Sequence, residues 1–147
     1  MDSFQTNLHL TVINSDGQLV DKTIAVHSDD FNIDEGDLEG ELCRAGALLC
    51  YYGDLAAELD AKASNAKNGL EEVEAVVAIT LRASGKYTQG MVDNALAINP
   101  DVKIKRDVLV EAQKEALKSS NLFRAMNQRV ECLKALSYRT NKQERNF

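Results

Sequence analysis

Basic side chains gather in one stretch of the chain, on either side of its single proline. Five of them fall between residues 82 and 106: Arg82, Lys86, Lys103, Lys105 and Arg106. Lysine and arginine are the residues that neutralise nucleic-acid phosphates. Tyr87 lies in the same stretch, where its ring can stack an unpaired base or, alternatively, pack against the helix that follows. The stretch is therefore the candidate site for an anionic polymer.

The other side chains that commonly do chemistry do not converge. The two histidines, His9 and His27, lie in a different segment from the three cysteines. No C-x-x-C pair occurs among Cys43, Cys50 and Cys132. We interpret the cysteines as reduced, half-buried thiols and the histidines as ordinary strand residues. No metal site is expected.

Catalytic motifs are not found either. Gly85-Lys86 lacks the spacing of a phosphate-binding P-loop, and the acidic stretch 28–37 lacks the ligand spacing of a calcium loop. We find no nucleophile motif and no pair of carboxylates in an evident cleft. We therefore predict that the protein is not an enzyme and needs no cofactor.

Charge is divided unevenly along the chain, whose formal net charge is −6. Residues 1–81 contain sixteen acidic and four basic side chains, a net charge of −12. Residues 82–147 contain seven acidic and thirteen basic side chains, a net charge of +6. Such a division indicates an anionic partner for the second half. The alternative is that the two halves neutralise each other, within a protomer or between neighbours.

Two interleaved apolar rows predict one long helix from Leu38 to about Leu81. The rows alternate at spacings of three and four, which is the a/d seam of a heptad repeat and requires a partner helix. Asn68-Gly69 lies inside the repeat and favours a turn. We expect a kink or a frayed turn there, with a complete break as the alternative. The rows are Leu38, Ala45, Tyr52, Leu59, Ala66, Val73 and Thr80, and Leu42, Leu49, Ala56, Ala63, Leu70 and Val77.

A short helix is predicted after this long one. Gly85 can end the long helix as its carboxyl-terminal cap, and Thr88 can cap a helix over residues 89–98. The apolar face of the short helix would hold Met91, Val92, Ala95 and Leu96.

The last helix is predicted from about residue 101 to residue 138, followed by a loose polar tail over 139–147. It carries a second seam at spacings of three and four. Because only a short helix separates the two seams, the long helices should pack antiparallel. The second seam consists of Leu109, Ala112, Ala116, Ser119, Phe123, Met126, Val130 and Leu133.

The amino-terminal residues predict a β-hairpin. Residues 7–14 alternate, with Leu8, Leu10 and Val12 on one face, and residues 19–26 are rich in β-branched side chains. Ser15-Asp16-Gly17 separates the two runs and is a strong hairpin signal. An isolated two-stranded hairpin is marginal in water, so it should pack on the helices or pair with another chain.

These elements predict a mainly α fold: a long antiparallel helical hairpin with a short intervening helix and an N-terminal β-hairpin. We divide it into a hairpin domain, residues 1–30, and a helical domain, residues 31–147. No apolar run approaches the roughly 20 residues that cross a bilayer. The first residues lack the pattern of a signal peptide. We therefore expect no membrane partner and a cytoplasmic location.

The order of elements resembles the UvsY-like family of phage recombination mediators. The resemblance covers roughly residues 40–138 and is carried by Leu81-Arg82-Ala83-Ser84-Gly85-Lys86-Tyr87-Thr88, Ile98-Asn99-Pro100-Asp101-Val102, Leu109-x-x-Ala112 and the stretch from Leu122 to Arg129. It implies a small helical oligomer that binds single-stranded DNA. It also implies that the protein helps a RecA-like recombinase to displace the single-strand-binding protein, in the cytoplasm of the phage's host.

Our leading hypothesis is therefore a non-catalytic recombination mediator whose basic stretch contacts DNA phosphates. The alternative is a structural or assembly protein that only oligomerises. Both seams are rich in alanine and bury little area, so we predict a homo-oligomer with Leu49, Leu59 or Phe123 at the contacts. If the basic stretch is not the DNA site, the next candidates are Lys114, Lys118, Arg124 and Arg129.

Overall fold

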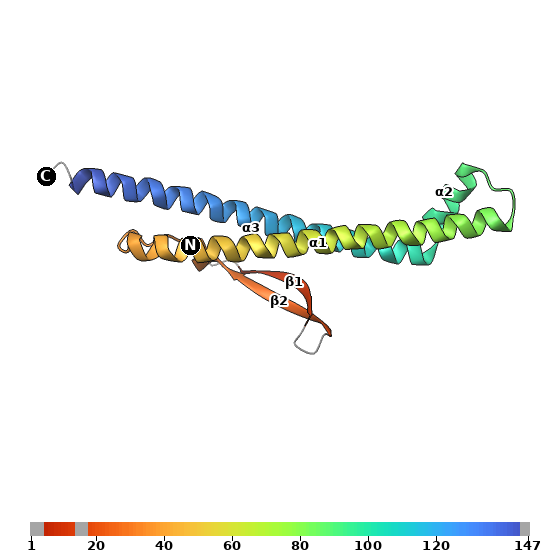
Figure 1. The fold of residues 1–147 in the computed structure, drawn as a ribbon, viewed down its shortest axis with the longest axis horizontal. Helices are drawn as coiled ribbons and strands as arrows, with labels where there is room; N and C mark the ends of the chain where they lie inside the picture. Colours follow the sequence, from red (N-terminus) through yellow and green to blue (C-terminus); the bar gives the residue numbers. More distant parts are fainter. Residues whose placement is uncertain (1–4, 14–17, 145–147) are drawn as a thin grey trace. The chain divides into compact units, whose positions relative to one another are not determined.

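The computed structural model describes residues 5–13 and 18–144 of the chain. The predicted fold class is confirmed: α1 and α3 form a long antiparallel helical hairpin, α2 lies between them in the sequence, and a β-hairpin precedes them (Figure 1). The elements are β1 (Gln5–Ile13), β2 (Leu19–His27), the short 3-10 helix η1 (Ser28–Asp30), α1 (Leu38–Ser84), α2 (Gln89–Ile98) and α3 (Pro100–Glu144).

Two compact units share the long helices. Unit 1 comprises Met1–Glu58 and Leu117–Phe147, and unit 2 comprises Leu59–Ala116. Unit 1 thus holds the β-hairpin with the first part of α1 and the last part of α3, and unit 2 holds α2 with the remaining parts. The boundary that we placed between residues 30 and 31 stays a prediction.

Helix α1 runs without interruption through Asn68-Gly69, so the alternative of two separate helices is wrong. Glycine in a helix costs about 1 kcal/mol relative to alanine, and this local cost does not break the helix. The apolar phase continues on both sides of the dipeptide, and Leu70 is buried directly after it. Helix stability in proteins comes mainly from packing of the apolar face, which here outweighs the turn preference of two residues.

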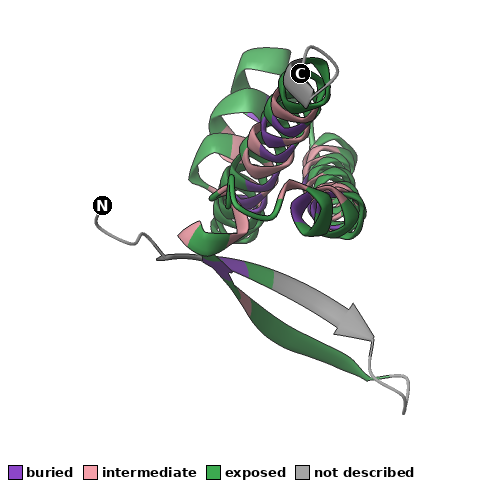
Figure 2. Cartoon of the chain, turned by 90° about the vertical axis from the view of Figure 1, so that its left-hand side faces the viewer, coloured by how far each residue is buried: buried purple, intermediate pink, exposed green. Residues whose placement is uncertain are grey.

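The core of unit 1 follows the predicted seams closely. Ala45 and Tyr52, from the row that begins at Leu38, are buried on α1. The α3 seam also contributes buried residues, namely Ser119, Met126 and Leu133. Figure 2 shows buried segments (purple) on the long helices between exposed ones (green). The row that begins at Leu42 is only half-buried in this unit. In unit 1 the buried face of α1 therefore consists mainly of the row that begins at Leu38.

Unit 2 has a smaller set of buried hydrophobic side chains: Leu59, Leu70, Val92, Val102 and Ala112. Alanines occupy much of the seam between α1 and α3, because Ala63, Ala66 and Ala116 are half-buried there. On α2, Val92 is buried and Ala95 and Leu96 are half-buried, as predicted. Met91 was wrongly assigned to this face. It is 51% exposed, so the inward face of α2 includes Val92, Ala95 and Leu96 but not position 91.

The β-hairpin is antiparallel, with Leu8 opposite Ile24 and Val12 opposite Val20. Leu8 and Val26 are fully buried, whereas most other described side chains of β2 are exposed. The predicted turn at Ser15-Asp16-Gly17 lies outside the described residues, and so do the side chains of Leu10 and Val12. Among the side chains of the hairpin that the structure describes, full burial is thus limited to Leu8 and Val26, near the end of β2 that leads into the linker (residues 31–37) before α1.

Helix α3 continues to Glu144, so the prediction of a loose tail from Arg139 is wrong for residues 139–144. These residues are polar, but arginine, lysine and glutamine are good helix formers. Thr140 donates a hydrogen bond from its hydroxyl to the carbonyl oxygen of Leu136 at 3.2 Å. Lys142 lies in the last turn, where a positive charge complements the helix dipole.

A buried ion pair holds the linker of unit 1 against the two helices. Arg129 on α3 pairs with Glu41 in the first turn of α1. The same guanidinium donates to the carbonyl oxygen of Asn32 in the linker, from Nε at 3.1 Å and from Nη2 at 3.0 Å. Its Nη1 is buried without a hydrogen-bond partner among the described residues. Because Arg129 is buried, it is removed from the alternative set of DNA-binding residues.

A second polar contact in unit 1 joins the end of η1 to α1. Asp30 accepts a hydrogen bond from the hydroxyl of Tyr52 at 2.8 Å and an ion-paired bond from Nη2 of Arg44 at 3.2 Å. Burial of the phenol raises the pKa of Tyr52, and the hydrogen bond to Asp30 raises it further. The ring of Phe31 lies 5.4 Å from that of Tyr52, centre to centre. These contacts hold Asp30 and Phe31 against α1.

Candidate nucleic-acid interface

All six residues of the predicted DNA site lie in unit 2, on three consecutive segments. Arg82 is in the last turn of α1, Lys86 and Tyr87 are in the linker to α2, and the other three are in the first turns of α3. Those three are Lys103, Lys105 and Arg106. Every one of the six is exposed. The unit therefore presents the basic stretch to solvent.

Arg82 is held in place by the start of α2. Its Nη2 donates to the side-chain oxygen of Gln89 at 2.8 Å, and the amide nitrogen of Gln89 donates to Asp93 at 2.8 Å. Thr88 fixes this turn as the predicted cap of α2, since its hydroxyl accepts a hydrogen bond from the backbone N–H of Met91. The bond to Gln89 uses one of the five N–H donors of the guanidinium. Gln89 thus orients the guanidinium of Arg82 without neutralising its charge.

Tyr87 lies over Gly85, and its ring is partly accessible. A Cβ placed on Gly85 would lie 3.4 Å from Cε2 of the ring. The side chain is 39% exposed. Gly85 follows α1 directly, at the position predicted to end the helix, but its φ lies outside the left-handed region that is common for a glycine cap. Its lack of a side chain instead leaves room for the tyrosine ring.

The amino terminus of α3 is closed by its own cap. The side-chain oxygen of Asn99 accepts hydrogen bonds from the backbone N–H groups of Asp101 at 2.9 Å and Val102 at 3.2 Å. The N–H of Lys103 donates to the backbone oxygen of Asn99 at 3.0 Å. Pro100 has no N–H to offer. The first backbone donors, which at a helix amino terminus can bind an anion, are therefore occupied, and a phosphate would have to be bound by side chains.

The three basic residues of α3 differ in how strongly they are compensated. Arg106 forms an ion pair with Glu74 of α1, with 3.3 Å between the guanidinium and carboxylate atoms. Both partners are partly exposed, so solvent screens the pair and its contribution to stability is small. Lys105 lies beside Glu72 and Asp101, which line the same groove. Lys103 is exposed one turn from the cap.

The residues predicted at contacts between subunits are largely used within the chain. Leu59 is fully buried. Leu49 and Phe123 are half-buried. A Cβ placed on Gly53 of α1 would lie 3.2 Å from the ring of Phe123, so this phenylalanine packs against the glycine. Contacts between subunits at these three positions stay a prediction.

The remaining alternative DNA-binding residues lie along α3. Lys114 pairs with Glu111 at 2.6 Å on the helix surface, and Arg124 is exposed. Lys118 is also exposed. Together with the buried Arg129, this set forms a less accessible group of cations than the basic stretch does.

A group of exposed apolar side chains in unit 2 was not predicted from the sequence. It consists of Val76, Ile79, Met91, Ile98, Ile104, Val108 and Val110, together with part of Tyr87. Val76 and Ile79 are three residues apart, and Ile104 and Val108 are four apart, so each pair shares a helix face. These spacings were visible in the sequence, but they fall outside the two seams on which our helix assignment rested. The cysteines also differ from expectation, since all three are exposed.

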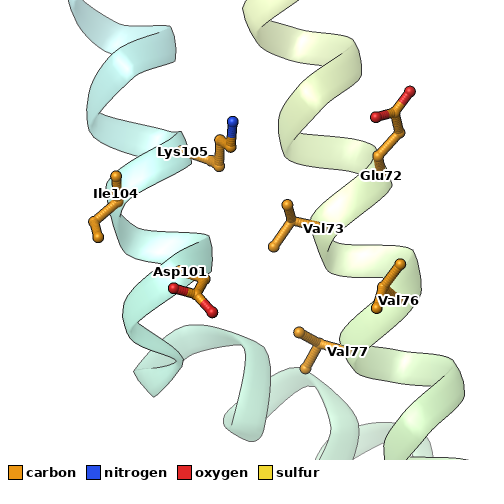
Figure 3. A pocket seen from close by; sticks show the side chains of 7 residues that line it. All are labelled: Glu72, Val73, Val76, Val77, Asp101, Ile104 and Lys105. Atoms are coloured by element: carbon orange, nitrogen blue, oxygen red, sulfur yellow. The ribbon is translucent and has the colours of Figure 1, made fainter.

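Some of these apolar side chains line a groove between α1 and α3 (Figure 3). Its volume is about 470 Å³. Val73 and Val77 point from α1 towards α3, and Lys105 points from α3 towards α1. The remaining lining residues are Glu72, Val76, Asp101 and Ile104. The groove thus combines an apolar floor with charges of both signs.

Residues 5–13 and 18–144 contain no group of three or more His, Cys, Asp or Glu side chains placed to hold a metal ion. Within the same ranges, none of the helices has the combination of length and apolar character that a membrane crossing requires. No known protein family, curated protein or solved structure matches this chain. The resemblance to phage recombination mediators therefore rests on the residues quoted from the sequence.

Proposed function

We propose that this protein is a non-catalytic recombination mediator of a phage, which binds single-stranded DNA through unit 2 as a homo-oligomer. It would help a RecA-like recombinase to replace the single-strand-binding protein in the host cytoplasm. The observation that carries the proposal is the exposed basic stretch. Between residues 82 and 106 five basic side chains accompany only two acidic ones, Asp93 and Asp101, in a chain whose overall charge is −6.

The expected mode of binding follows from how these cations are held. Side chains from three segments would contact phosphates, since the backbone donors at the start of α3 are already bonded to Asn99. Phosphate contacts position a protein on DNA but do not read its sequence. Tyr87 would add stacking on any base, which is also tolerant of sequence. Binding should therefore be independent of sequence and weaken steeply as salt rises.

A salt titration with labelled single-stranded DNA tests the proposal. Replacement of Arg82, Lys86, Lys103 and Lys105 by alanine should weaken binding. It should also lower the slope of log affinity against log salt by about 3, since each lost phosphate contact contributes roughly 0.7 for single strands. The matched control removes four exposed cations of unit 1, Arg124, Lys134, Arg139 and Lys142. It should leave the slope unchanged.

Two outcomes would contradict the proposed site or function. A larger effect of the control variant than of the test variant would place the DNA along the last part of α3. The absence of binding by the parent protein at low salt would instead favour an assembly protein that does not bind DNA. That alternative has its own support in the exposed valine and isoleucine side chains of unit 2, since clustered apolar exposure marks protein contacts.

A further inference from the structure

We propose that the groove between α1 and α3 in unit 2 is the interface between two copies of this chain, which pack there as a four-helix bundle. The inference deepens the homo-oligomer of the proposed function, but it does not depend on DNA binding. It also places the contact between copies at the groove and not at Leu49, Leu59 or Phe123.

The first argument is that unit 2 leaves large apolar side chains exposed, although alanines occupy several positions of its seam beside the buried Leu59, Leu70 and Val102. The seam between α1 and α3 contains the buried Ala112 and the half-buried Ala63, Ala66 and Ala116. On the flank of that seam, Val76 is 63% exposed and Ile104 is 60% exposed. A helical hairpin that functioned alone would gain more from burying the valine and isoleucine than the alanines, because burial scales with apolar area.

The second argument is that exposed apolar side chains of both helices line the groove or lie one turn from a residue that lines it. Val76 and Ile104 line the same groove, one from each helix (Figure 3). Ile79 lies one turn from Val76, and Val108 lies one turn from Ile104, on the same helix faces. Both are more than half exposed. Rows of side chains on two neighbouring helices can receive two further helices, because helices pack with the side-chain ridges of one in the grooves of the other.

The third argument identifies the occupant as a second copy. The groove carries two acidic side chains, Glu72 and Asp101, and one basic side chain, Lys105. A two-fold axis places each side chain of one copy against the same surface of the other, so such an interface must be complementary to itself. A surface with both signs of charge meets this condition, since Lys105 of each copy can face an acidic side chain of the other. A partner helix with one predominant sign of charge would meet repulsion from part of the same set.

The test uses the full-length protein and measures its mass without DNA. Sedimentation equilibrium over a range of protein concentrations should show association of the parent chain. The double variant Val76→Ser/Ile104→Ser should associate at least about a hundredfold more weakly, because four exposed apolar side chains are lost per pair of copies. Serine is neutral, so the charge of the DNA site is unchanged. The control is Val110→Ser, which alters an exposed valine of α3 that does not line the groove.

A charge exchange provides a second measurement on the same interface. Lys105→Glu should weaken association, and the double variant Lys105→Glu/Glu72→Lys should restore it, since a restored pair of opposite charges is a specific signature of contact. Circular dichroism would verify that each variant keeps its helical content.

The inference is overturned if the parent chain is monomeric throughout, which would leave the groove to a different partner. It is also overturned if the serine variant associates as the parent does. Binding of single-stranded DNA, measured on the same samples, separates this inference from the proposed function. A weakly associating serine variant together with a parent that does not bind DNA would support the interface and reject the mediator. A parent that binds DNA, together with a serine variant that associates as the parent does, would support the mediator and reject the interface.

Discussion

Units 1 and 2 are built from the same two helices but use them differently. In unit 1 the seam contains large side chains, such as Tyr52, Met126 and Leu133, and a buried ion pair fixes the linker. In unit 2 half-buried alanines occupy several seam positions, and Val76, Ile79 and Ile104 remain exposed. The comparison shows that an a/d pattern predicts which helix faces meet. The sizes of the residues on and beside the seam determine how much of the apolar surface is left for another molecule.

The largest expected effect tests whether unit 1 depends on its buried ion pair. Arg129→Met should lower the free energy of unfolding by about 3–5 kcal/mol, because it leaves the carboxylate of Glu41 buried without its partner. Chemical denaturation followed by circular dichroism measures the loss. Lys134→Met is the control on the same helix, since the pair between Lys134 and Glu131 is exposed. The control should change stability by less than about 1 kcal/mol.

The double variant Arg129→Met/Glu41→Leu should regain most of this stability. Replacement of a buried ion pair by apolar side chains of similar size is often neutral or stabilising. The buried Nη1 of Arg129 has no hydrogen-bond partner among the described residues. Removal of the guanidinium therefore also removes an unsatisfied buried donor, which favours this recovery. A single Arg129→Met variant as stable as the parent would show that the pair does not hold unit 1 together.

Deletion of residues 1–27 should have the next largest effect. It removes the fully buried Leu8 and Val26, each worth about 1.5–3 kcal/mol of burial. It also removes the open strand edges, which can pair with another chain. We expect a lower melting temperature or a lower oligomer mass with unchanged helical content. Leu19→Ser, at an exposed position of β2, is the control and should have little effect. A truncated protein with the parent's mass and melting temperature would show that the hairpin is dispensable for both.

A smaller effect is expected at the contact between η1 and α1. Tyr52→Phe should cost about 1–2 kcal/mol, because the buried side chain of Tyr52 loses its hydrogen bond to Asp30. The raised pKa of Tyr52 means that the folded state favours the neutral phenol. Its contribution to stability is fully present below the ordinary pKa of 10.0 and is lost as the pH rises above that value.

The parent should therefore lose more stability above pH 10 than Tyr52→Phe does, in a series of denaturation curves at increasing pH. Burial also raises the pKa of Tyr51, which is present in both proteins and cancels in the comparison. Equal alkaline losses in the two proteins would show that the phenol of Tyr52 is solvated in solution.

The smallest effects compare one glycine from each unit. A Cβ on Gly69 of unit 2 would meet nothing within 4 Å, so Gly69→Ala should stabilise α1 by about 0.5–1 kcal/mol. A Cβ on Gly53 of unit 1 would lie 3.2 Å from the ring of Phe123, so Gly53→Ala should gain less or destabilise. Gly46→Ala, also in open space but within unit 1, serves as the control. Equal gains at all three positions would mean that unit 1 is no more tightly packed than unit 2.

The helices and their facing sides were predictable because the heptad pattern is local in the sequence. Ser119 was correctly placed in the seam despite its polarity, because its position in the repeat fixed its direction. The ion pair between Glu41 and Arg129 was missed, since each charge lies beside a seam and only the tertiary pairing of the helices brings the two together. Arg129 was therefore grouped with surface cations.

The candidate site was predictable as a list of exposed charges but not in its local bonding. The cap at Asn99 was not predicted, because the same residues, Asn99-Pro100-Asp101, also favour a simple turn. The end of α3 was misplaced because polarity alone does not distinguish a solvated helix from a loose tail. The exposed apolar side chains of unit 2 were overlooked because scattered exposed valines are common, and only the groove shows that Val76 and Ile104 lie at one site.

The bond between Arg129 and the carbonyl oxygen of Asn32 joins positions 97 residues apart. Synthesis on the ribosome proceeds from the amino terminus, so the linker before α1 is made long before the arginine that binds it. The α1 and α2 segments are complete by then, so the contacts of Asp30 with Tyr52 and Arg44 can form first and the bond from Arg129 to the linker forms later. During that interval Glu41 and the linker are open to water and to other chains. A nascent protein of this kind has its longest opportunity for intermolecular pairing at its amino-terminal strands.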